Sequence, residues 1–124
     1  LKEYEPLMKY NLTTKQEMIL MLIRKENKLT VSEIASKMNV TSSAASQIIS
    51  KLEKENFIKR DINPNNRREI IVTLHQRGEE FFKEYKKIEL HIIEHYYSKL
   101  ELDEIVTLRN ITLKLERLMA ETIK

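Results

Sequence analysis

Hydrophobic residues recur along this chain mainly at the three- and four-residue spacing of amphipathic helices. The first group with this spacing predicts the end of such a helix and consists of Leu1, Tyr4, Leu7 and Met8. A second helix is predicted from Thr13, which can form a capping box with Gln16 ahead of the apolar stretch 18–23. Thr14 and Glu17 could form the same kind of capping box one residue later. The stretch is apolar on nearly every side, which is typical of a central helix.

Two shorter patterns predict the next two helices. Thr30 and Glu33 can form a second capping box. The apolar face of the short helix that they open holds Ile34, Ala35 and Met38. Residues 39–41 end this helix, and the next one starts with Thr41 or Ser42 as its N-cap. Its inward stripe has the spacing i, i+3, i+4, i+7 and consists of Ala45, Ile48, Ile49 and Leu52.

The opposite face of this third helix is small and polar, and it carries Ser42, Ser43, Ser46, Gln47 and Ser50. No acidic residue occurs from Val40 to Leu52, whereas a merely solvated helix normally carries Glu and Lys. Serine is a poor helix former, so we expect something other than helix stability to have selected this face. Short hydroxyl and amide groups can approach bases and phosphates closely. A plain serine-rich surface helix is the alternative interpretation.

The segment after the third helix has the pattern of a β-hairpin. Residues 57–60 and 69–74 are rich in strand formers, and the Pro- and Asn-rich stretch 61–68 between them carries two arginines. Three helices followed by a hairpin with a basic tip describe a winged helix-turn-helix domain, predicted at residues 13–74. The candidate DNA contacts are Thr41, Ser42, Ser43, Ala44, Ser46, Gln47, Ser50, Arg67 and Arg68.

Two more helices are predicted after the hairpin. The first runs from Gln76 to Lys99, and the second has a seam with the 3, 4, 3 spacing of a helix that packs against a partner. This apolar surface exceeds what a wing domain needs, so residues 1–12 and 75–124 are predicted to form a helical dimerisation region. The fold class is therefore mainly α with a small β wing. The residues expected at a homodimer interface are Leu1, Tyr4, Leu108, Ile111, Leu115 and Leu118.

Composition and charge narrow the classes of function. The 124 residues suit one domain, and one Gly with two Pro favours long helices. No apolar run reaches the roughly 18 residues of a membrane span, and no secretory signal is visible. The absence of Cys excludes disulfides and thiolate metal sites, so we expect a cytoplasmic protein without a cofactor.

Residues 1–74 hold 13 Lys and Arg against 9 Asp and Glu, whereas residues 75–124 hold 9 against 10. A polyanion is therefore expected to bind the first part.

Several segments together resemble the MarR (multiple antibiotic resistance regulator) family of bacterial repressors, without a gap over residues 12–78. Residues 12–16 resemble its opening Leu-Thr-x-x-Gln, and residues 31–35 resemble its second-helix signature. Residues 52–60 resemble its Leu-Glu-x-x-Gly-Leu-Ile-x-Arg segment, and residues 72–78 its Val-x-Leu-Thr-x-x-Gly. Residues 66–68 (Asn-Arg-Arg) stand where the family has Asp-x-Arg at the wing tip.

Three residues depart from the family pattern. Asn56 replaces a Gly, which is tolerable because Asn also adopts the left-handed conformation. His75 replaces a Thr that caps the following helix, so this cap is expected to be weaker. Asn66 replaces an Asp that pairs with the wing arginine, so its hydrogen bond with Arg68 lacks charge assistance.

The resemblance implies a mostly helical homodimer whose N- and C-terminal helices interlock. Two recognition helices would enter successive major grooves of a pseudo-palindrome in double-stranded DNA, and the wing arginines would reach the flanking minor grooves. Arg68 is the expected minor-groove residue, since a narrow groove concentrates negative potential. The resemblance also implies release from DNA by a small phenolic or other amphipathic effector bound between the two regions. No pattern in this sequence identifies that ligand.

Residues 91–95 (His-Ile-Ile-Glu-His) support a rival interpretation, because they match the pattern of one metallopeptidase group. His91 and His95 share a helix face and could hold Zn²⁺, with Glu94 as the base. No third ligand is evident in the sequence, so we predict that the protein is not an enzyme. A zinc-responsive regulator is another alternative, although some such members of the family carry a ligand histidine where this chain has Met18. A winged helix that binds only proteins is disfavoured by the acid-free face and the two wing arginines.

Overall fold

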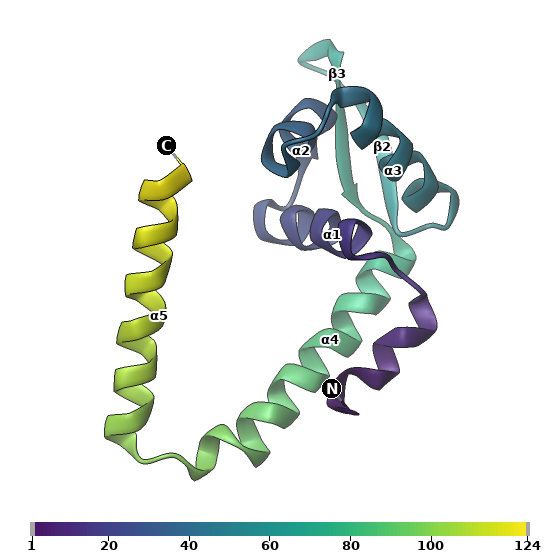
Figure 1. The fold of residues 1–124 in the computed structure, drawn as a ribbon. Helices are drawn as coiled ribbons and strands as arrows, with labels where there is room; N and C mark the ends of the chain where they lie inside the picture. The colour runs from purple at the N-terminus through teal and green to yellow at the C-terminus, as the bar shows by residue number, and fades with distance from the viewer. Residues whose placement is uncertain (1, 124) are drawn as a thin grey trace. The chain divides into compact units, whose positions relative to one another are not determined.

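The structure is a computed structural model that describes residues 2–123. It separates into two compact units, residues 1–86 and residues 87–124. The first unit holds η1 (Lys2–Tyr10), α1 (Thr14–Glu26), β1 (Leu29–Thr30), α2 (Val31–Met38), α3 (Ser42–Lys54), β2 (Ile58–Asn63), β3 (Asn66–Leu74) and the first half of α4 (Gln76–His95) (Figure 1). The second unit holds the rest of α4, the short η2 (Tyr97–Lys99) and α5 (Leu102–Ile123).

The starts of the first helices follow from local hydrogen bonds that the sequence predicts. At α1, the backbone N–H of Thr13 donates to Gln16 Oε1 at 2.9 Å, and the N–H of Gln16 donates to Thr13 Oγ1 at 3.2 Å. Thr30 and Glu33 form the same reciprocal box at α2. These bonds satisfy N–H groups that a helix start otherwise leaves unpaired, so both predicted boxes are confirmed. Of the two alternatives at α1, Thr13 is the N-cap.

Asparagine takes the backbone positions between helices where glycine is usual. Asn11, Asn27, Asn39 and Asn56 all have positive φ, between 50° and 68°. Asn39 follows α2 as its left-handed C-cap, and Asn56 stands at the family's glycine position with φ 66°. Asn is among the few residues that tolerate this conformation, because its short amide can bond to nearby backbone. The chain therefore makes these turns with one glycine in the whole sequence.

A three-stranded antiparallel sheet in the order β1-β3-β2 supports the helices. The hairpin pairs Ile58 with Leu74 and Asp61 with Ile71. Its strands run further than the sequence predicted, because the turn between them consists of Pro64 and Asn65 alone. β1 has two residues and was not predicted. The wing is thus the predicted hairpin with longer paired strands.

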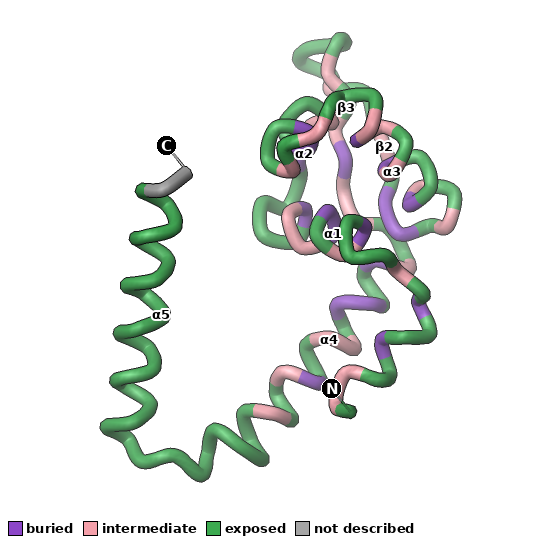
Figure 2. Tube along the Cα trace, viewed as in Figure 1, coloured by how far each residue is buried: buried purple, intermediate pink, exposed green. Residues whose placement is uncertain are grey.

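The core of the first unit lies where α1, α2 and α3 meet the sheet (Figure 2). Its fully buried side chains include Ile19, Leu20, Ile23, Ile34, Ala45, Ile49, Leu52, Phe57, Ile58 and Val72. The stretch 18–23, predicted to suit a central helix because it is apolar on nearly every side, buries Ile19, Leu20 and Ile23 but leaves Met18 49% exposed. The three helices otherwise bury the stripes that their spacing predicted, with Ile48 and Met38 half-buried.

Gly78 allows α4 to start directly against the base of the hairpin. A Cβ built at this position would lie 2.3 Å from the carbonyl oxygen of Phe57. The same carbonyl accepts a hydrogen bond from the backbone N–H of His75 at 2.9 Å, and the N–H of Arg77 donates to the Asn56 carbonyl. The family's glycine is therefore required here by close backbone approach rather than by an unusual φ. Arg77 also places its guanidinium 4.4 Å from the centre of the Phe57 ring.

The N-terminal segment is a 3₁₀ helix and not the end of an α-helix. A 3₁₀ helix has three residues per turn, so Tyr4, Leu7 and Tyr10 lie on one face. Leu7 and Tyr10 are buried, whereas Met8, which an α-helix would place beside Tyr4 and Leu7, is 75% exposed. The Tyr10 ring packs edge-on against Phe81 at 5.3 Å between centroids, and burial raises the pKa of Tyr10.

The long helix predicted to reach Lys99 ends at His95. The N–H of Lys99 bonds to the Tyr96 carbonyl, a three-residue step, and the Ser98 hydroxyl donates to the Glu94 carbonyl. This tighter turn, with a side chain competing for a helix carbonyl, ends the α-helical pattern. The second unit continues in α5, whose described side chains are all exposed (Figure 2).

Candidate nucleic-acid interface

The polar face of α3 is presented to solvent by the burial of its opposite face. Ala45, Ile49 and Leu52 are 0% exposed, which fixes the rotation of the helix about its axis. The side chains on the other face are exposed at Thr41, Ser42, Ser43, Gln47 and Ser50 and half-buried at Ala44 and Ser46. The predicted contacts on α3 are therefore uncharged and accessible to solvent, so a groove of DNA could reach them.

Thr41 has a structural role in addition to its predicted one. It is the N-cap of α3, and its hydroxyl oxygen accepts a hydrogen bond from the backbone N–H of Ala44 at 3.0 Å. Its hydroxyl hydrogen can still donate to an acceptor such as a phosphate oxygen.

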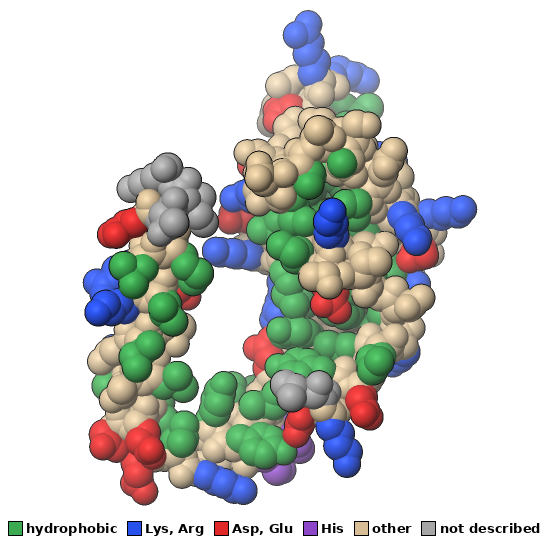
Figure 3. Space-filling model, viewed as in Figure 1, with side chains coloured by type: hydrophobic (Ala, Val, Ile, Leu, Met, Phe, Trp, Pro, Cys, Tyr) green, Lys and Arg blue, Asp and Glu red, His purple; other side chains and the backbone are tan. Residues whose placement is uncertain are grey.

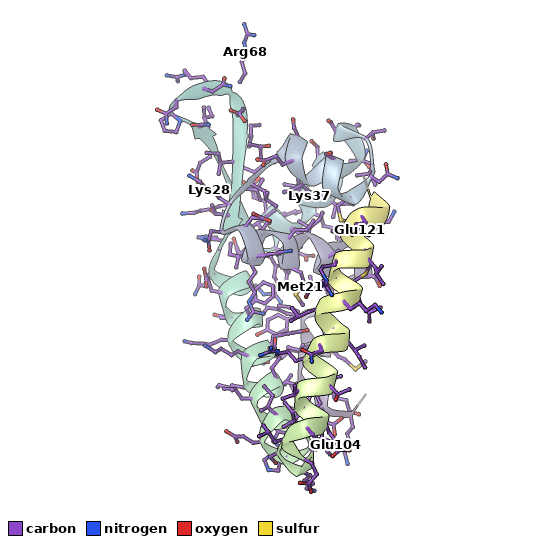
Figure 4. The ribbon with its side chains drawn as sticks, turned by 90° about the vertical axis from the view of Figure 1, so that its left-hand side faces the viewer. Met21, Lys28, Lys37, Arg68, Glu104 and Glu121 are labelled. Atoms are coloured by element: carbon purple, nitrogen blue, oxygen red, sulfur yellow. The ribbon has the colours of Figure 1, made fainter. Side chains whose placement is uncertain are left out.

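The two wing arginines lie on a strand rather than in a loop. Arg67 and Arg68 are the second and third residues of β3, and both are exposed. Successive residues of a strand point to opposite faces, so the two side chains diverge. Arg68 extends from the far end of the hairpin, away from the helices of its unit (Figure 4). The predicted tip, residues 61–68, is therefore shorter in the structure, and both arginines belong to the paired strand that follows it.

Side-chain hydrogen bonds shape the tip of the wing. Asn66 Oδ1 accepts from the backbone N–H of Arg68 at 3.2 Å, and Asn66 Nδ2 donates to Glu69 Oε1 at 3.0 Å. Asn63 Oδ1 accepts from the N–H of Asn65 at 3.0 Å. The expected bond between Asn66 and Arg68 thus forms with the backbone of Arg68, not with its guanidinium. Asn66 orders the turn, and Glu69, which sequence reasoning did not single out, takes part in the network.

Comparison with known proteins shows to which family the chain belongs. Residues 12–70 match the model of the MarR family. The chain is 35% identical over 118 residues to the HTH-type transcriptional repressor MdtR of Bacillus subtilis, covering 95% of this chain and 76% of the relative.

The chain belongs to the MarR family. It is a DNA-binding transcriptional regulator with a winged helix. Its fold is similar to the crystal structure of YusO from Bacillus subtilis, at 33% identity and a TM-score of 0.67 over 93% of this chain and 82% of the other. It is also similar to Streptococcus pneumoniae FabT, solved in complex with DNA, at 19% identity and a TM-score of 0.76 over 91% of this chain and 78% of the other. The FabT likeness, at that identity, concerns the fold alone.

An ion pair joins the recognition helix of this MarR-family chain to its wing. Arg60 on β2 places Nη2 at 2.8 Å and Nε at 3.1 Å from Glu53 Oε1, while its backbone N–H donates to Glu53 Oε2 at 3.0 Å. The hydrogen bonds from Arg60 lower the pKa of the Glu53 carboxyl. Both residues belong to the segment that resembles the family, but sequence reasoning gave them no role. Their contact depends on how α3 turns into β2, which residue spacing does not reveal.

We expect the Glu53→Ala variant to lose about 1 kcal/mol of unfolding free energy at pH 7, because solvent screens a pair whose carboxylate side is 35% exposed. The folded-state pKa of Glu53 is lowered, so the pair stabilises fully above its ordinary value of 4.5 and less as the pH falls through the folded-state value. Urea unfolding at pH 7 and at successive steps below 4.5, at one protein concentration, measures this difference. Arg60→Ala and the double variant complete a cycle that isolates the pair. A difference between wild type and Glu53→Ala that is equal at every pH would contradict the assignment.

The candidate dimerisation residues differ in what surrounds them. On α5, Leu108, Ile111, Leu115 and Leu118 are between 44% and 53% exposed. Tyr4 packs against Tyr85 of its own unit, with 6.1 Å between ring centroids. Leu1 lies outside the described residues. Leu102, Ile105, Val106, Leu113 and Met119 are also exposed large apolar residues on α5, beyond the predicted seam. Hydrophobic side chains are visible along this helix in Figure 3.

The weak metal candidates lie at the end of α4. The rings of His91 and His95 stack with 4.0 Å between centroids, and His95 Nδ1 lies 3.0 Å from the His91 carbonyl oxygen. One ring nitrogen of His95 is therefore engaged with the backbone. Among the side chains that the structure describes, those of residues 2–121, no group of three or more His, Asp or Glu is placed to hold a metal ion. None of the described helices is long and apolar enough to cross a membrane.

Proposed function

We propose that the chain is a transcriptional repressor that binds a pseudo-palindromic operator as a homodimer. The observation that carries the proposal is the acid-free polar face of α3, exposed beside a hairpin that ends in two arginines. Hydroxyl and amide groups without carboxylates suit a surface that must approach a polyanion closely. The name of the relative MdtR, a transcriptional repressor, supports repression over activation.

Each DNA-binding element has a distinct role in this proposal. Gln47 is exposed near the centre of the α3 face, where its amide can pair with an adenine edge in the major groove. Ser42, Ser43, Ser46 and Ser50 surround it and allow close approach. Arg68 reaches a minor groove flanking the half-site, where a narrow groove concentrates negative potential. The ion pair between Glu53 and Arg60 holds α3 and the wing at a constant spacing.

Dimerisation supplies a second α3 and a second wing for the other half of the operator. The exposed apolar side chains of α5 form a surface that a single chain leaves in water, and apolar patches of this extent mark interaction sites. Pairing with a second copy through the seam would bury them. We therefore assign residues 13–74 to DNA binding and residues 1–12 and 75–124 to dimerisation. A small-molecule effector that releases the dimer from DNA completes the proposed function.

Selection of bound duplexes from a random-sequence pool tests the proposal. A two-fold symmetric dimer with one α3 per protomer is expected to enrich a sequence with two inverted half-sites, whose centres lie about 10 base pairs apart. The purified chain and a competitor of unrelated DNA suffice for the measurement. Enrichment of a single unrepeated half-site would exclude the symmetric dimer, and no enrichment at all would exclude sequence-specific binding.

A further inference from the structure

The start of α4 touches the residues that adjoin the end of α3. Residues 55–57 follow directly after α3, and the backbone N–H of Arg77 donates to the Asn56 carbonyl at 2.9 Å. One residue later, the missing side chain of Gly78 lets α4 lie against the Phe57 carbonyl. The recognition helix and α4 are therefore coupled through direct backbone contacts, although 21 residues separate Asn56 from Arg77 in the sequence.

The Arg77 side chain strengthens this junction. Its Nη1 donates to the carbonyl oxygen of Glu55, the C-cap of α3, at 3.4 Å. A cation is favoured there because the last carbonyls of a helix carry partial negative charge. The guanidinium also lies 4.4 Å from the centre of the Phe57 ring and 5.7 Å from that of Tyr10, distances at which an aromatic face attracts a cation. Arg77 thus contacts the end of α3, the residue before β2 and the end of η1 at once.

The rings beside Arg77 belong to a packed aromatic cluster. Tyr10, Phe57 and Phe81 are all buried. The Tyr10 ring packs edge-on against Phe57 at 6.1 Å and against Phe81 at 5.3 Å between centroids. Tyr10 ends η1 and Phe81 lies on α4, so the cluster joins η1, α4 and the segment after α3. Arg77 is itself half-buried, and partial removal from water strengthens its attraction to the rings.

The orientation of α3 on α4 has a consequence for a homodimer. In each protomer, α4 continues from the DNA-binding domain into the region that we assign to dimerisation. A change in the angle between α3 and α4 would therefore move both recognition helices and change the distance between them. Inverted half-sites on DNA lie about one helical turn apart, so that distance decides which operators fit. A stiff junction favours one half-site spacing, and a loose junction tolerates several.

We propose that Arg77 is a positioning residue that fixes the half-site spacing selected by the dimer, without touching DNA itself. The inference rests on the proposed function, because it requires a symmetric dimer. The guanidinium is engaged at the junction, whereas Arg68 extends from the far end of the hairpin (Figure 4). The family resemblance gives Arg77 no role, since it stands at an unspecified position of the Val-x-Leu-Thr-x-x-Gly segment.

Duplexes that carry the selected half-site twice in inverted orientation, with centres about 8 to 12 base pairs apart, test this role. Fluorescence anisotropy of the full chain should show that wild type prefers one spacing. Arg77→Ala should reduce the ratio of affinities between the preferred and the neighbouring spacings by about tenfold, because both protomers lose their cation–π contacts. Lys83→Ala, which removes the same charge from an exposed position on α4, should keep the wild-type ratio.

The ratio separates positioning from other roles of Arg77. A partly unfolded variant loses affinity for every spacing by the same factor, so its ratio stays at the wild-type value. A phosphate contact would make the salt slope of Arg77→Ala smaller by about one unit per protomer, whereas we expect the wild-type slope. Thermal unfolding verifies the fold of each variant. Should Arg77→Ala not fold, Arg77→Lys lacks the planar group that stacks on Phe57 and should still reduce the ratio by about threefold.

The possible results distinguish this inference from the proposed function. A wild-type spacing preference that the folded Arg77 variants retain in full would overturn the positioning role and leave the proposed function intact. A reduced salt slope in Arg77→Ala would overturn it as well, in favour of a direct contact with DNA. A wild type that binds every spacing alike would contradict the proposed symmetric dimer, and the positioning role with it.

Discussion

Replacing Leu115 with aspartate is expected to abolish the dimer. Leu115 is 52% exposed in the single chain, at the middle of a seam with Ile111 and Leu118 on either side. In a symmetric pair of seams it would be buried, so aspartate would carry an unpaired charge into an apolar interface from each protomer. A charge left without its partner in such a setting costs about 3–5 kcal/mol. Because two copies change at once, we expect dissociation at micromolar concentration.

Sedimentation equilibrium measures this outcome directly. Wild type should sediment as two chains of 14.8 kDa each, and Leu115→Asp as one. Asn110→Asp is the matched control, since it adds the same charge to α5 away from the seam and should remain dimeric. Circular dichroism distinguishes a dissociated chain from an unfolded one, because the first unit has its own core. A wild-type chain that sediments as a monomer would refute the proposed architecture.

The sequence predicted well those features that depend on residues close in the chain. The capping boxes of α1 and α2 span three residues each, so residue identity nearly determines them. The left-handed conformation at Asn56 was predicted for the same reason. The buried stripe of α3 follows from helical spacing alone, and it left the polar face for solvent.

The predictions that failed depended on competing local patterns. The spacing of Tyr4 and Leu7 fits both an α-helix and a 3₁₀ helix, and the burial of Tyr10 with the exposure of Met8 decides for the latter. Apolar positions continue past His95, but a 3₁₀ turn and the Ser98 hydroxyl end the helix there. Asn is a poor strand former, yet its side chains hold the wing turn and allow both strands to extend.

Contacts between elements lay beyond sequence reasoning. The bond from Arg60 to Glu53 crosses the junction of α3 and β2, and the counter-charge of Lys9 for Glu84 joins segments 75 residues apart. The contacts of Arg77 with Phe57 and Tyr10 likewise require η1, α4 and the segment after α3 to meet. None of these geometries follows from the spacing of residues, because each depends on the packing of whole elements.

The separate roles of α3 and the wing predict opposite effects for two alanine variants. Gln47→Ala should remove a base contact, which costs about 1–3 kcal/mol for the specific duplex and little for other DNA. Arg68→Ala should weaken binding to every duplex, because it removes a charge that meets phosphates and a narrow groove. The slope of log affinity against log salt should fall by about one unit per protomer. Lys59→Ala, which removes an exposed charge from β2 outside the predicted contact set, is the control for Arg68→Ala.

Fluorescence anisotropy of the selected duplex and a scrambled one, titrated at several salt concentrations, tests most directly whether α3 and the wing bind DNA. Wild type should prefer the selected duplex. Gln47→Ala should lose most of that preference while it keeps its affinity for the scrambled duplex, and Arg68→Ala should lose affinity for both while it keeps the preference. If both variants bind the two duplexes with wild-type affinity and salt dependence, then α3 and the wing do not carry DNA recognition in this chain.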